Sequence, residues 1–381
     1  MTLYLHIGTM KTGTSSIQDF LFANRSILLK QDFLYPISIK NIYHLNDHNP
    51  LVDSSTRGKI CNKQLKKLNK EIIQSKANKI IISAENIQWR LNSIDQIQNM
   101  KDSFQKLGFK KIYIILYLRN PVDLFISMCS QSLKDNDLND FSLSLPQENK
   151  KALVLCNHQQ TIQKYEAIFG KENLKIRLFE KDEFYKQDLL KDFIHILSLS
   201  WNENFLLPQK QNETLNLLGM KILHEANLKN ITLSYQSRYI DIVNFFDKYF
   251  SNTKEERLKF SPSQEIYQSY LHYFKISNEW VKQNYFTHKN RLFKEKNMEQ
   301  YKENYEIKEF CNSDLESVIN FSLDILDSKN KEINILKELL NKKEMKIAIF
   351  IYNKRKKIKS FFKNILSFIP FSSFSKTSNN F

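Results

Sequence analysis

A short loop near the start of the chain has the residue types of a phosphate-binding site. It runs His6-Ile-Gly-Thr-Met-Lys-Thr-Gly-Thr-Ser-Ser16, between a run of β-forming residues and a segment with helical spacing. Free backbone N–H groups and the helix dipole favour an anion at such a junction. Gly13 lets the backbone approach a ligand closely, and Lys11 supplies a compact positive charge. Hydroxyl groups that could bind phosphate oxygens come from Thr12, Thr14, Ser15 and Ser16. We call this segment, residues 6–16, the cradle loop.

The spacing of the cradle loop differs from that of ATPases and kinases. Their pattern GxxxxGK[ST] places the lysine directly after the last glycine, whereas Lys11 precedes Gly13 by two residues. No Asp that could bind a metal ion ends the apolar runs at residues 83 and 118. These features disfavour a metal-dependent phosphotransferase, and we expect no metal ion. Two alternatives stay open: a small-molecule kinase, and a non-catalytic, membrane-associated protein with the same fold.

A second segment could bind a phosphate monoester. The apolar run Lys111-Ile-Tyr-Ile-Ile-Leu-Tyr-Leu118 is followed by Arg119, and Ser127 comes about two turns into the next helical segment. Pro121 suits the first position of that helix, and Asp123 suits its first turn. An arginine fork and a hydroxyl at the carboxyl end of a strand can together hold a phosphate. A lone arginine at a strand end is also common in structural ion pairs. This segment therefore indicates a phosphate site only in combination with the cradle loop.

The elements that position these residues alternate between strands and helices. Strands are expected at Thr2–Ile7, Lys79–Ser83, Lys111–Leu118 and Leu174–Phe179. Helices are expected between them at Ser15–Lys30, Asn62–Ser75, Ile94–Leu107 and Gln159–Phe169, and beyond residue 185 at Asp188–Leu199, Asn212–Asn227 and Ser263–Tyr285. Continuous apolar runs are typical of strands buried on both faces of a parallel sheet. The pattern predicts an α/β fold, a P-loop-like parallel sheet flanked by helices with a helical C-terminal extension, whose ligands lie at the carboxyl ends of the strands.

Together the two segments resemble the PAPS-dependent sulfotransferase family, which uses 3′-phosphoadenosine 5′-phosphosulfate (PAPS). The cradle loop looks like the family's 5′-phosphosulfate loop, and the strand with Arg119 and then Ser127 looks like its 3′-phosphate motif. The likeness is strongest to the bacterial branch, which opens with a similar His-Ile-Gly and Lys-Thr-Gly-Thr. Weaker likenesses follow at Tyr165–Glu180, at Asn212-Glu-Thr-Leu-Asn, and at Ser277-Asn-Glu-Trp with Arg291-Leu-Phe. The resemblance covers roughly residues 1–295.

The resemblance implies transfer of a sulfuryl group from PAPS to a hydroxyl or amine. In an in-line transfer the acceptor attacks sulfur while the bridging oxygen of the donor gains negative charge, so a cation beside that oxygen stabilises the transition state. Lys11 is the candidate for this role. The donor-binding residues that the resemblance implies are Lys11, Thr12, Gly13, Thr14, Ser15, Ser16, Arg119 and Ser127.

Two residues are candidates for the base that deprotonates the acceptor. Glu85 follows the apolar run that ends at Ser83, and a Ser-x-Glu at this place resembles the family's pattern with its glutamate base. His48, in the loop His44-Leu-Asn-Asp-His48, is the alternative, because imidazole is a good base near neutral pH. His6, within the first strand, is expected to be a core or supporting residue rather than a catalyst.

The acceptor is expected to be a carbohydrate, for example of a cell-surface glycan. The helical segments after residues 130 and 200 are rich in Tyr, Phe and Asn. Aromatic faces pack on the apolar faces of sugars, and amides bind their hydroxyl groups. The same residues could instead form a core, and this alternative stays open.

Positive charge is concentrated at the end of the chain. The formal net charge is +16, and residues 331–381 contain twelve Lys or Arg against three Glu. Within this tail the stretch Lys354–Ile369 joins basic residues to an aromatic, apolar face, which favours a helix on an anionic membrane surface over a nucleic-acid site. A solvated basic tail is the alternative. We expect a sulfotransferase domain at 1–296, with an α/β core to about 185 and a helical part at about 186–296, followed by a helical and basic tail at 297–381.

The segment before the basic stretch contains a short heptad repeat, of the kind found in the seam of a coiled coil with one polar residue. The seam residues, spaced 4-3-4-3, are Ile319, Leu323, Leu326, Asn330 and Ile333. The repeat ends at Lys337. It predicts either a short coiled coil that joins two copies of the chain or a single helix packed on the main body.

The cysteines and the first residues bear on the compartment. Cys61, Cys129, Cys156 and Cys311 form no CxxC pair and have no histidine at metal-ligand spacing, so free thiols are expected. Residues 1–10 contain no charged leader followed by a long apolar stretch. These observations predict a cytoplasmic protein, peripheral on the inner face of the membrane if the tail binds lipid.

Overall fold

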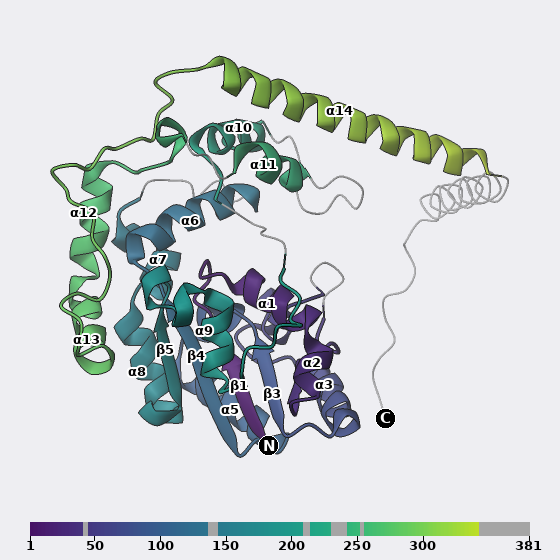
Figure 1. The fold of residues 1–381 in the computed structure, drawn as a ribbon, viewed down its shortest axis with the longest axis vertical. Coiled ribbons are helices and arrows are strands. Elements are labelled where there is room, and N and C mark those ends of the chain that lie inside the picture. Colours follow the sequence, from purple (N-terminus) through teal and green to yellow (C-terminus); the bar gives the residue numbers. More distant parts are fainter. Residues whose placement is uncertain (41–44, 136–143, 209–213, 230–241, 252–254, 343–381) are drawn as a thin grey trace, which may run out of the picture.

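A five-stranded parallel sheet forms the centre of the protein (Figure 1). The computed structural model describes residues 1–40, 45–135, 144–208, 214–229, 242–251 and 255–342. The strands are β1 (Thr2–His6), β2 (Phe33–Leu34), β3 (Lys79–Ser83), β4 (Lys111–Leu118) and β5 (Leu174–Leu178), in the spatial order β2-β3-β1-β4-β5. Every pairing is parallel. The α/β fold predicted from the sequence is confirmed.

The register of β1 sets the level of the neighbouring strand ends. His6 is opposite Ser83 of β3 and opposite Ile115 of β4. The carboxyl ends of β1 and β3 therefore lie level, and β4 continues past them to Leu118. Because the strands are parallel, the segments that follow them emerge at one edge of the sheet.

Helices cover both faces of the sheet, because its side chains alternate between two buried clusters. One face packs against α1 (Thr14–Ala23), α2 (Arg25–Leu29) and α9 (Leu189–Ile196). The other packs against α3 (Asn62–Ser75), α5 (Ile94–Lys106), α8 (His158–Phe169) and α13 (Lys275–Tyr285). The short helix α4 (Asn86–Arg90) follows β3 at the carboxyl edge.

A second hydrophobic core lies beyond the carboxyl edge and is built from helices. It contains residues of α6 (Pro121–Lys134), α7 (Lys150–Leu155), α10 (Leu217–Leu228), α11 (Ile242–Phe250) and α12 (Gln264–Tyr273). In Figure 1 this group of helices stands above the sheet, with α14 (Asn312–Asn341) lying across its top. The predicted change from alternating strands and helices to helices alone after β5 holds for the part of the chain that the structure describes.

The predicted elements differ from the structure in four places. The helix expected at Asn212–Asn227 begins only at Leu217, after the capping residue Asn216. The helix expected at Ser15–Lys30 is divided at Asn24, whose side chain bonds both the Phe20 carbonyl and the backbone N–H and C=O of Leu206, each at 2.8 Å. The helix expected at Ser263–Tyr285 is divided at the buried Phe274. The edge strand β2 was missed, because two residues are too few to show a periodicity.

The first half of α14 is docked on the second core. Arg257 forms a bidentate ion pair with the buried Asp314, at 2.7 and 2.8 Å. Asp324 accepts hydrogen bonds from Lys248 and Tyr249 of α11, each at 2.6 Å. Phe321 packs on two phenylalanines of α11. The helix that follows the expected boundary at residue 296 thus packs on the second core.

The predicted heptad seam lies on the opposite side of α14. Ile319, Leu323, Leu326 and Ile333 are between 45% and 59% exposed. The docked residues Phe321 and Asp324 occupy other heptad positions, so one face of the helix is packed and the seam faces solvent. Pairing of two copies through this seam stays a prediction. No helix among the described residues is long and apolar enough to cross a membrane, and the stretch Lys354–Ile369 lies outside those residues.

If the seam joins two copies, the double substitution Leu323→Asp and Leu326→Asp should abolish self-association. Each change places a charge where the coiled-coil model requires an apolar layer. Sedimentation velocity of the full chain over a range of concentrations measures this directly. Ile335→Asp is the matched control, because Ile335 is also 50% exposed but stands outside the seam. A wild-type chain that remains monomeric at every concentration would contradict the prediction.

Candidate functional site

The cradle loop, Glu85 and Arg119 meet at the carboxyl edge of the sheet. They follow β1, β3 and β4 respectively. A guanidinium N–H of Arg119 donates to the Lys11 carbonyl at 2.6 Å. A Cβ added to Gly8 would come within 3.5 Å of the Glu85 Cβ. The structure thus brings the cradle loop together with Arg119 and with Glu85.

The cradle loop turns into α1 at Gly13. This residue has φ 72°, a conformation that favours glycine, and an added Cβ would come within 2.4 Å of a Leu189 methyl group. The close approach is thus to α9, whereas the sequence analysis expected it to be to a ligand. No side chain caps α1 and no acidic residue stands in its first turn. The first N–H groups of α1 therefore keep their affinity for an anion.

The four hydroxyl residues of the cradle loop differ in their surroundings. Thr12 is fully buried, and its hydroxyl donates to the Thr9 carbonyl at 2.6 Å, so it braces the loop from within. Thr14 is buried, and Ser15 and Ser16 are partly exposed in the first turn of α1. The serines are the better placed of the four to meet a ligand.

Arg119 is fixed by three contacts. Its guanidinium donates to Lys11 and lies over the Phe179 ring, 5.5 Å from the ring centroid. Its carbonyl lies 2.8 Å from Nε2 of His158. Burial lowers the pKa of Arg119, and Asp123 opposes that change. These contacts hold the guanidinium group of Arg119 between the cradle loop and the end of β5.

Helix α6 begins as the sequence predicted. Asn120 caps it by accepting from the Val122 N–H at 3.0 Å, Pro121 stands in its first turn, and Ser127 is buried about two turns on. Residues spaced by four and three lie on one helix face. Ser127 therefore shares a face with Gln131 and Lys134.

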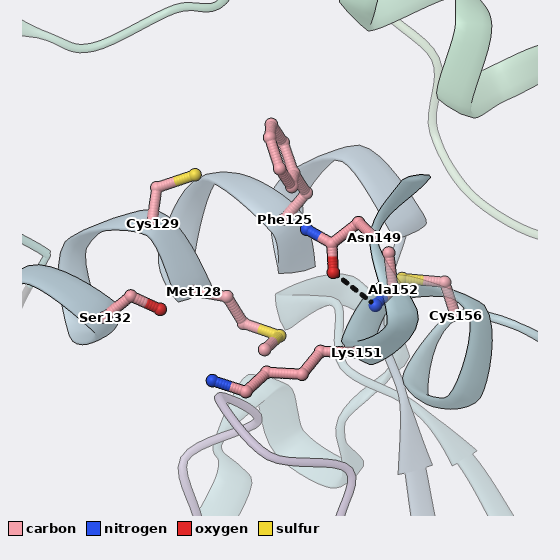
Figure 2. Close-up of a pocket in the computed structure, with 8 residues that line it drawn as sticks. All are labelled: Phe125, Met128, Cys129, Ser132, Asn149, Lys151, Ala152 and Cys156. Carbon is pink, nitrogen blue, oxygen red and sulfur yellow. Dashed lines mark hydrogen bonds between the residues drawn. The ribbon is translucent and has the colours of Figure 1, made fainter. Parts of the chain in front are cut away.

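The opposite face of α6 packs against α7 (Figure 2). Phe125, Met128, Cys129 and Ser132 from α6 border a cavity of about 10 Å³ together with residues of α7 and its flanks. A space of that size is at the lower limit for one water molecule. This face of α6 therefore serves packing and offers no room for a substrate.

Lys11 points its ammonium group at α6. Its Nζ donates to Gln131 Oε1 at 3.2 Å. Burial, followed by the charges of Lys134 and Arg119, lowers the pKa of Lys11 to about 8, against the opposing effect of Asp135 and Asp247. A lysine with a lowered pKa near a helix N-terminus is a candidate functional group.

Glu85 is held by two amides that the sequence analysis missed. Gln18 Nε2 donates to one carboxylate oxygen at 2.7 Å, and Asn49 Nδ2 donates to the other at 2.9 Å. Asn49 also accepts from the Asn86 N–H at 3.0 Å. Gln18 is four residues after Thr14 on α1, so its helix face was a signal in the sequence. Nothing local indicated Asn49.

His48 does not have the geometry of a base. Its Nδ1 accepts from the Ser83 N–H at 3.0 Å, so its Nε2 is the protonated nitrogen and donates to the Pro36 carbonyl at 2.8 Å. Burial lowers the pKa of His48 to about 4. Neither nitrogen is free to take a proton from an acceptor, so the alternative base of the sequence analysis is disfavoured. His48 instead anchors the turn that carries Asn49.

His6 is a core residue, as expected. Its Nδ1 lies 2.9 Å from the Ser83 hydroxyl, and its ring stands edge-on to Phe193. Burial lowers the pKa of His6 to about 3. The residue is neutral near pH 7 and supports the end of β1.

Several of the buried polar atoms without a hydrogen-bond partner among the described residues lie near the carboxyl edge. They include atoms of His6, Thr9, Gln88 and Glu180, which lie at or shortly after the ends of β1, β3 and β5, and of His158, whose other ring nitrogen lies 2.8 Å from the Arg119 carbonyl. Such atoms are costly to leave unpaired and call for a further partner. They fit a polar ligand or bound water at this edge.

Among the residues that the structure describes, no group of three or more His, Cys, Asp or Glu side chains is arranged to hold a metal ion. The four cysteines are free thiols, as expected.

Comparison with known proteins identifies similar solved structures. No family model matches the chain, and none of the curated proteins matches it. A sulfotransferase from Alicyclobacillus acidocaldarius is 14% identical, with a TM-score of 0.40, over 75% of this chain and 96% of its own. The mouse sulfotransferase SULT7A1, solved in complex with PAP, is 14% identical, with a TM-score of 0.30, over 74% of this chain and 88% of its own. At this identity and these TM-scores the likenesses carry no argument about the chemistry of this chain.

The buried histidine His48 should make the fold sensitive to acid. Its folded pKa of about 4 lies below the unfolded value, so the unfolded chain binds more protons between about pH 6.5 and 4. Stability should therefore fall as pH falls through this window, with His48 contributing up to about 3 kcal/mol.

The substitution His48→Asn should make that pH dependence shallower while costing about 1–3 kcal/mol at neutral pH through lost hydrogen bonds. Urea unfolding at several pH values measures both effects. The exposed His288, changed to Asn, is the control and should alter neither. An unchanged slope in His48→Asn would refute the assignment of His48 as a buried neutral anchor.

Proposed function

We propose that this chain is a PAPS-dependent sulfotransferase. The observation that carries the proposal is the hydrogen bond from Arg119 to the Lys11 carbonyl, at 2.6 Å. It joins the two segments that the sequence predicts for the two ends of one donor molecule. Glu85 stands beside Gly8 of the same loop, so a candidate base accompanies the donor site.

The donor would be bound through its two phosphate-bearing ends. The uncapped N-terminus of α1, with Ser15 and Ser16, suits the 5′-phosphosulfate. Arg119 and Ser127 suit the 3′-phosphate, because a guanidinium fork and a hydroxyl provide several donors to one phosphate. The unpaired polar atoms near the carboxyl edge are consistent with a polar ligand there.

Lys11 and Glu85 would have different roles in the reaction. Bound PAPS supplies a sulfuryl group whose bond to the phosphate oxygen breaks as the acceptor oxygen attacks sulfur. The ammonium of Lys11 stabilises the charge that develops on that bridging oxygen. Glu85 takes the proton of the acceptor. Each of its oxygens accepts one amide hydrogen bond, which leaves a lone pair for that proton.

The acceptor that we propose is a hydroxyl or amine of a carbohydrate, such as a cell-surface glycan. Amides surround Glu85, and amides pair well with sugar hydroxyls. We also propose that the enzyme is cytoplasmic and that its basic stretch, Lys354–Ile369, binds an anionic membrane surface. Such a location would bring the enzyme to an acceptor of this kind. We propose no nucleic-acid partner and no metal ion.

Thermal-shift titration of the full chain with PAP, ADP and ATP, with and without Mg²⁺, tests the donor site. A ligand of the folded state at a hundred times its dissociation constant adds about 2.7 kcal/mol of stability. We expect stabilisation by PAP without metal and its loss in Arg119→Ala.

Arg25→Ala is the matched control for this experiment. Arg25 also donates to a backbone carbonyl and lies over a phenylalanine ring, but on α2. It should leave the PAP shift unchanged. Stabilisation by ATP with Mg²⁺ and indifference to PAP would instead favour the small-molecule kinase. Indifference to all three nucleotides would favour the non-catalytic protein.

Single-turnover release of sulfate label from PAPS tests the two catalytic assignments. The acceptor is either water or a methyl glycoside. With both acceptors, Lys11→Ala should lower the rate of label release on the order of a hundredfold. Glu85→Gln should lower transfer to the glycoside while PAP binding is retained. His48→Asn should lower transfer less than Glu85→Gln in the folded fraction, because it disturbs only the turn that carries Asn49. Full transfer by Glu85→Gln would remove Glu85 as the base.

A further inference from the structure

Both the backbone and the side chain of Lys11 form hydrogen bonds to the segment that contains β4 and α6. Its carbonyl accepts from Arg119 at 2.6 Å, and its ammonium donates to Gln131 Oε1 at 3.2 Å. Its backbone has φ 63°, which residues other than glycine seldom adopt. These contacts give the side chain a defined direction before any ligand is present.

Gln131 is itself oriented by a neighbour. Its Nε2 donates to Asp135 Oδ1 at 3.0 Å, one helical turn further on. An amide whose N–H group is engaged in this way presents its oxygen to the other side. That oxygen is the one that meets the ammonium of Lys11.

The charges around Lys11 compete. Lys134 from α6 and Arg119 from the end of β4 disfavour a further positive charge, as burial does more strongly. Asp135 after α6 and Asp247 on α11 favour it. The pKa of Lys11 is already lowered to about 8, so a modest further fall in this pKa would leave much of Lys11 neutral near pH 7. The contact with Gln131 opposes such a fall, because a hydrogen bond from an ammonium is stronger than one from a neutral amine.

We propose that Gln131, oriented by Asp135, is a positioning residue that keeps the ammonium of Lys11 charged and directed at the donor site. The role of Lys11 in this inference rests on the proposed function. The contact itself does not, so the two can fail separately.

The substitutions at residue 131 should act in opposite directions. Gln131→Leu removes the acceptor, so the pKa of Lys11 should fall; a fall of about one unit raises the neutral fraction at pH 7 about fivefold. Gln131→Glu places a carboxylate at the same point, so the pKa should rise. Asp135→Asn should lower it less than Gln131→Leu, because Asp135 is exposed and its charge is screened.

Trace acetylation of the full chain from neutral to alkaline pH, read by mass spectrometry at Lys11, measures this change. Acetylation follows the neutral amine, and the pH midpoint does not depend on how accessible the side chain is. We expect a midpoint near 8 in the wild type, lower in Gln131→Leu and higher in Gln131→Glu. The alkaline limb of PAPS turnover should move in parallel.

A second glutamine–aspartate pair provides the control. Gln98 donates to Asp102 at 2.6 Å with the same spacing on α5, and among the described residues no lysine is seen to donate to Gln98. Gln98→Leu and Asp102→Asn should leave the Lys11 midpoint unchanged. An unmoved midpoint in a Gln131→Leu chain with wild-type circular dichroism would overturn the inference. Failure of the wild type to bind PAP would overturn the proposed function, while the midpoint would still decide the role of Gln131.

Discussion

The parallel pairing of β1 between β3 and β4 is the constraint on which the site depends. It continues beyond the strand, because the Tyr117 N–H donates to the Gly8 carbonyl at 2.9 Å and the Thr9 N–H donates to the Tyr117 carbonyl at 3.0 Å. The first half of the cradle loop is thereby attached to β4, two residues before Arg119. A hydrogen bond from Arg119 to the Lys11 carbonyl closes the loop against the strand end. A ligand would meet a backbone whose groups are already oriented, which lowers the cost of ordering on binding.

Helix α6 connects this edge to the second core. One face carries Ser127, Gln131 and Lys134, and the other packs on α7. Lys134 forms an ion pair with Asp247 of α11 at 2.5 Å. The same helix thus presents polar groups toward Lys11 and fixes the helices above it. Packing on one face and chemistry on the other is possible because residues spaced by three and four share a helix face.

The other side of the site is organised by polar side chains. His48 links the Pro36 carbonyl to the end of β3, and this anchors the turn that presents Asn49 to Glu85. Gln18, from α1, supplies the second amide that binds Glu85. A carboxylate held at both oxygens has little rotational freedom, which would suit the role of base that we propose for Glu85. The imidazole serves this arrangement by being neutral and fully bonded.

Local sequence determined the cradle loop, four of the five strands and the start of α6. A buried strand requires an unbroken apolar run, and a proline or a glycine fixes its own turn, so these features are written in neighbouring residues. The roles of His48, Asn49, Gln18 and Gln131 emerged only from the tertiary structure. Each depends on a hydrogen bond to a residue distant in the chain, such as that from Lys11 to Gln131, and no local pattern encodes which distant groups the sheet will bring together. The break at Asn24 has the same cause, because its side chain bonds to Leu206. The kinds of residue in the sequence indicated which chemistry was possible. The order of the parallel strands decided which of these residues lie close enough to act together.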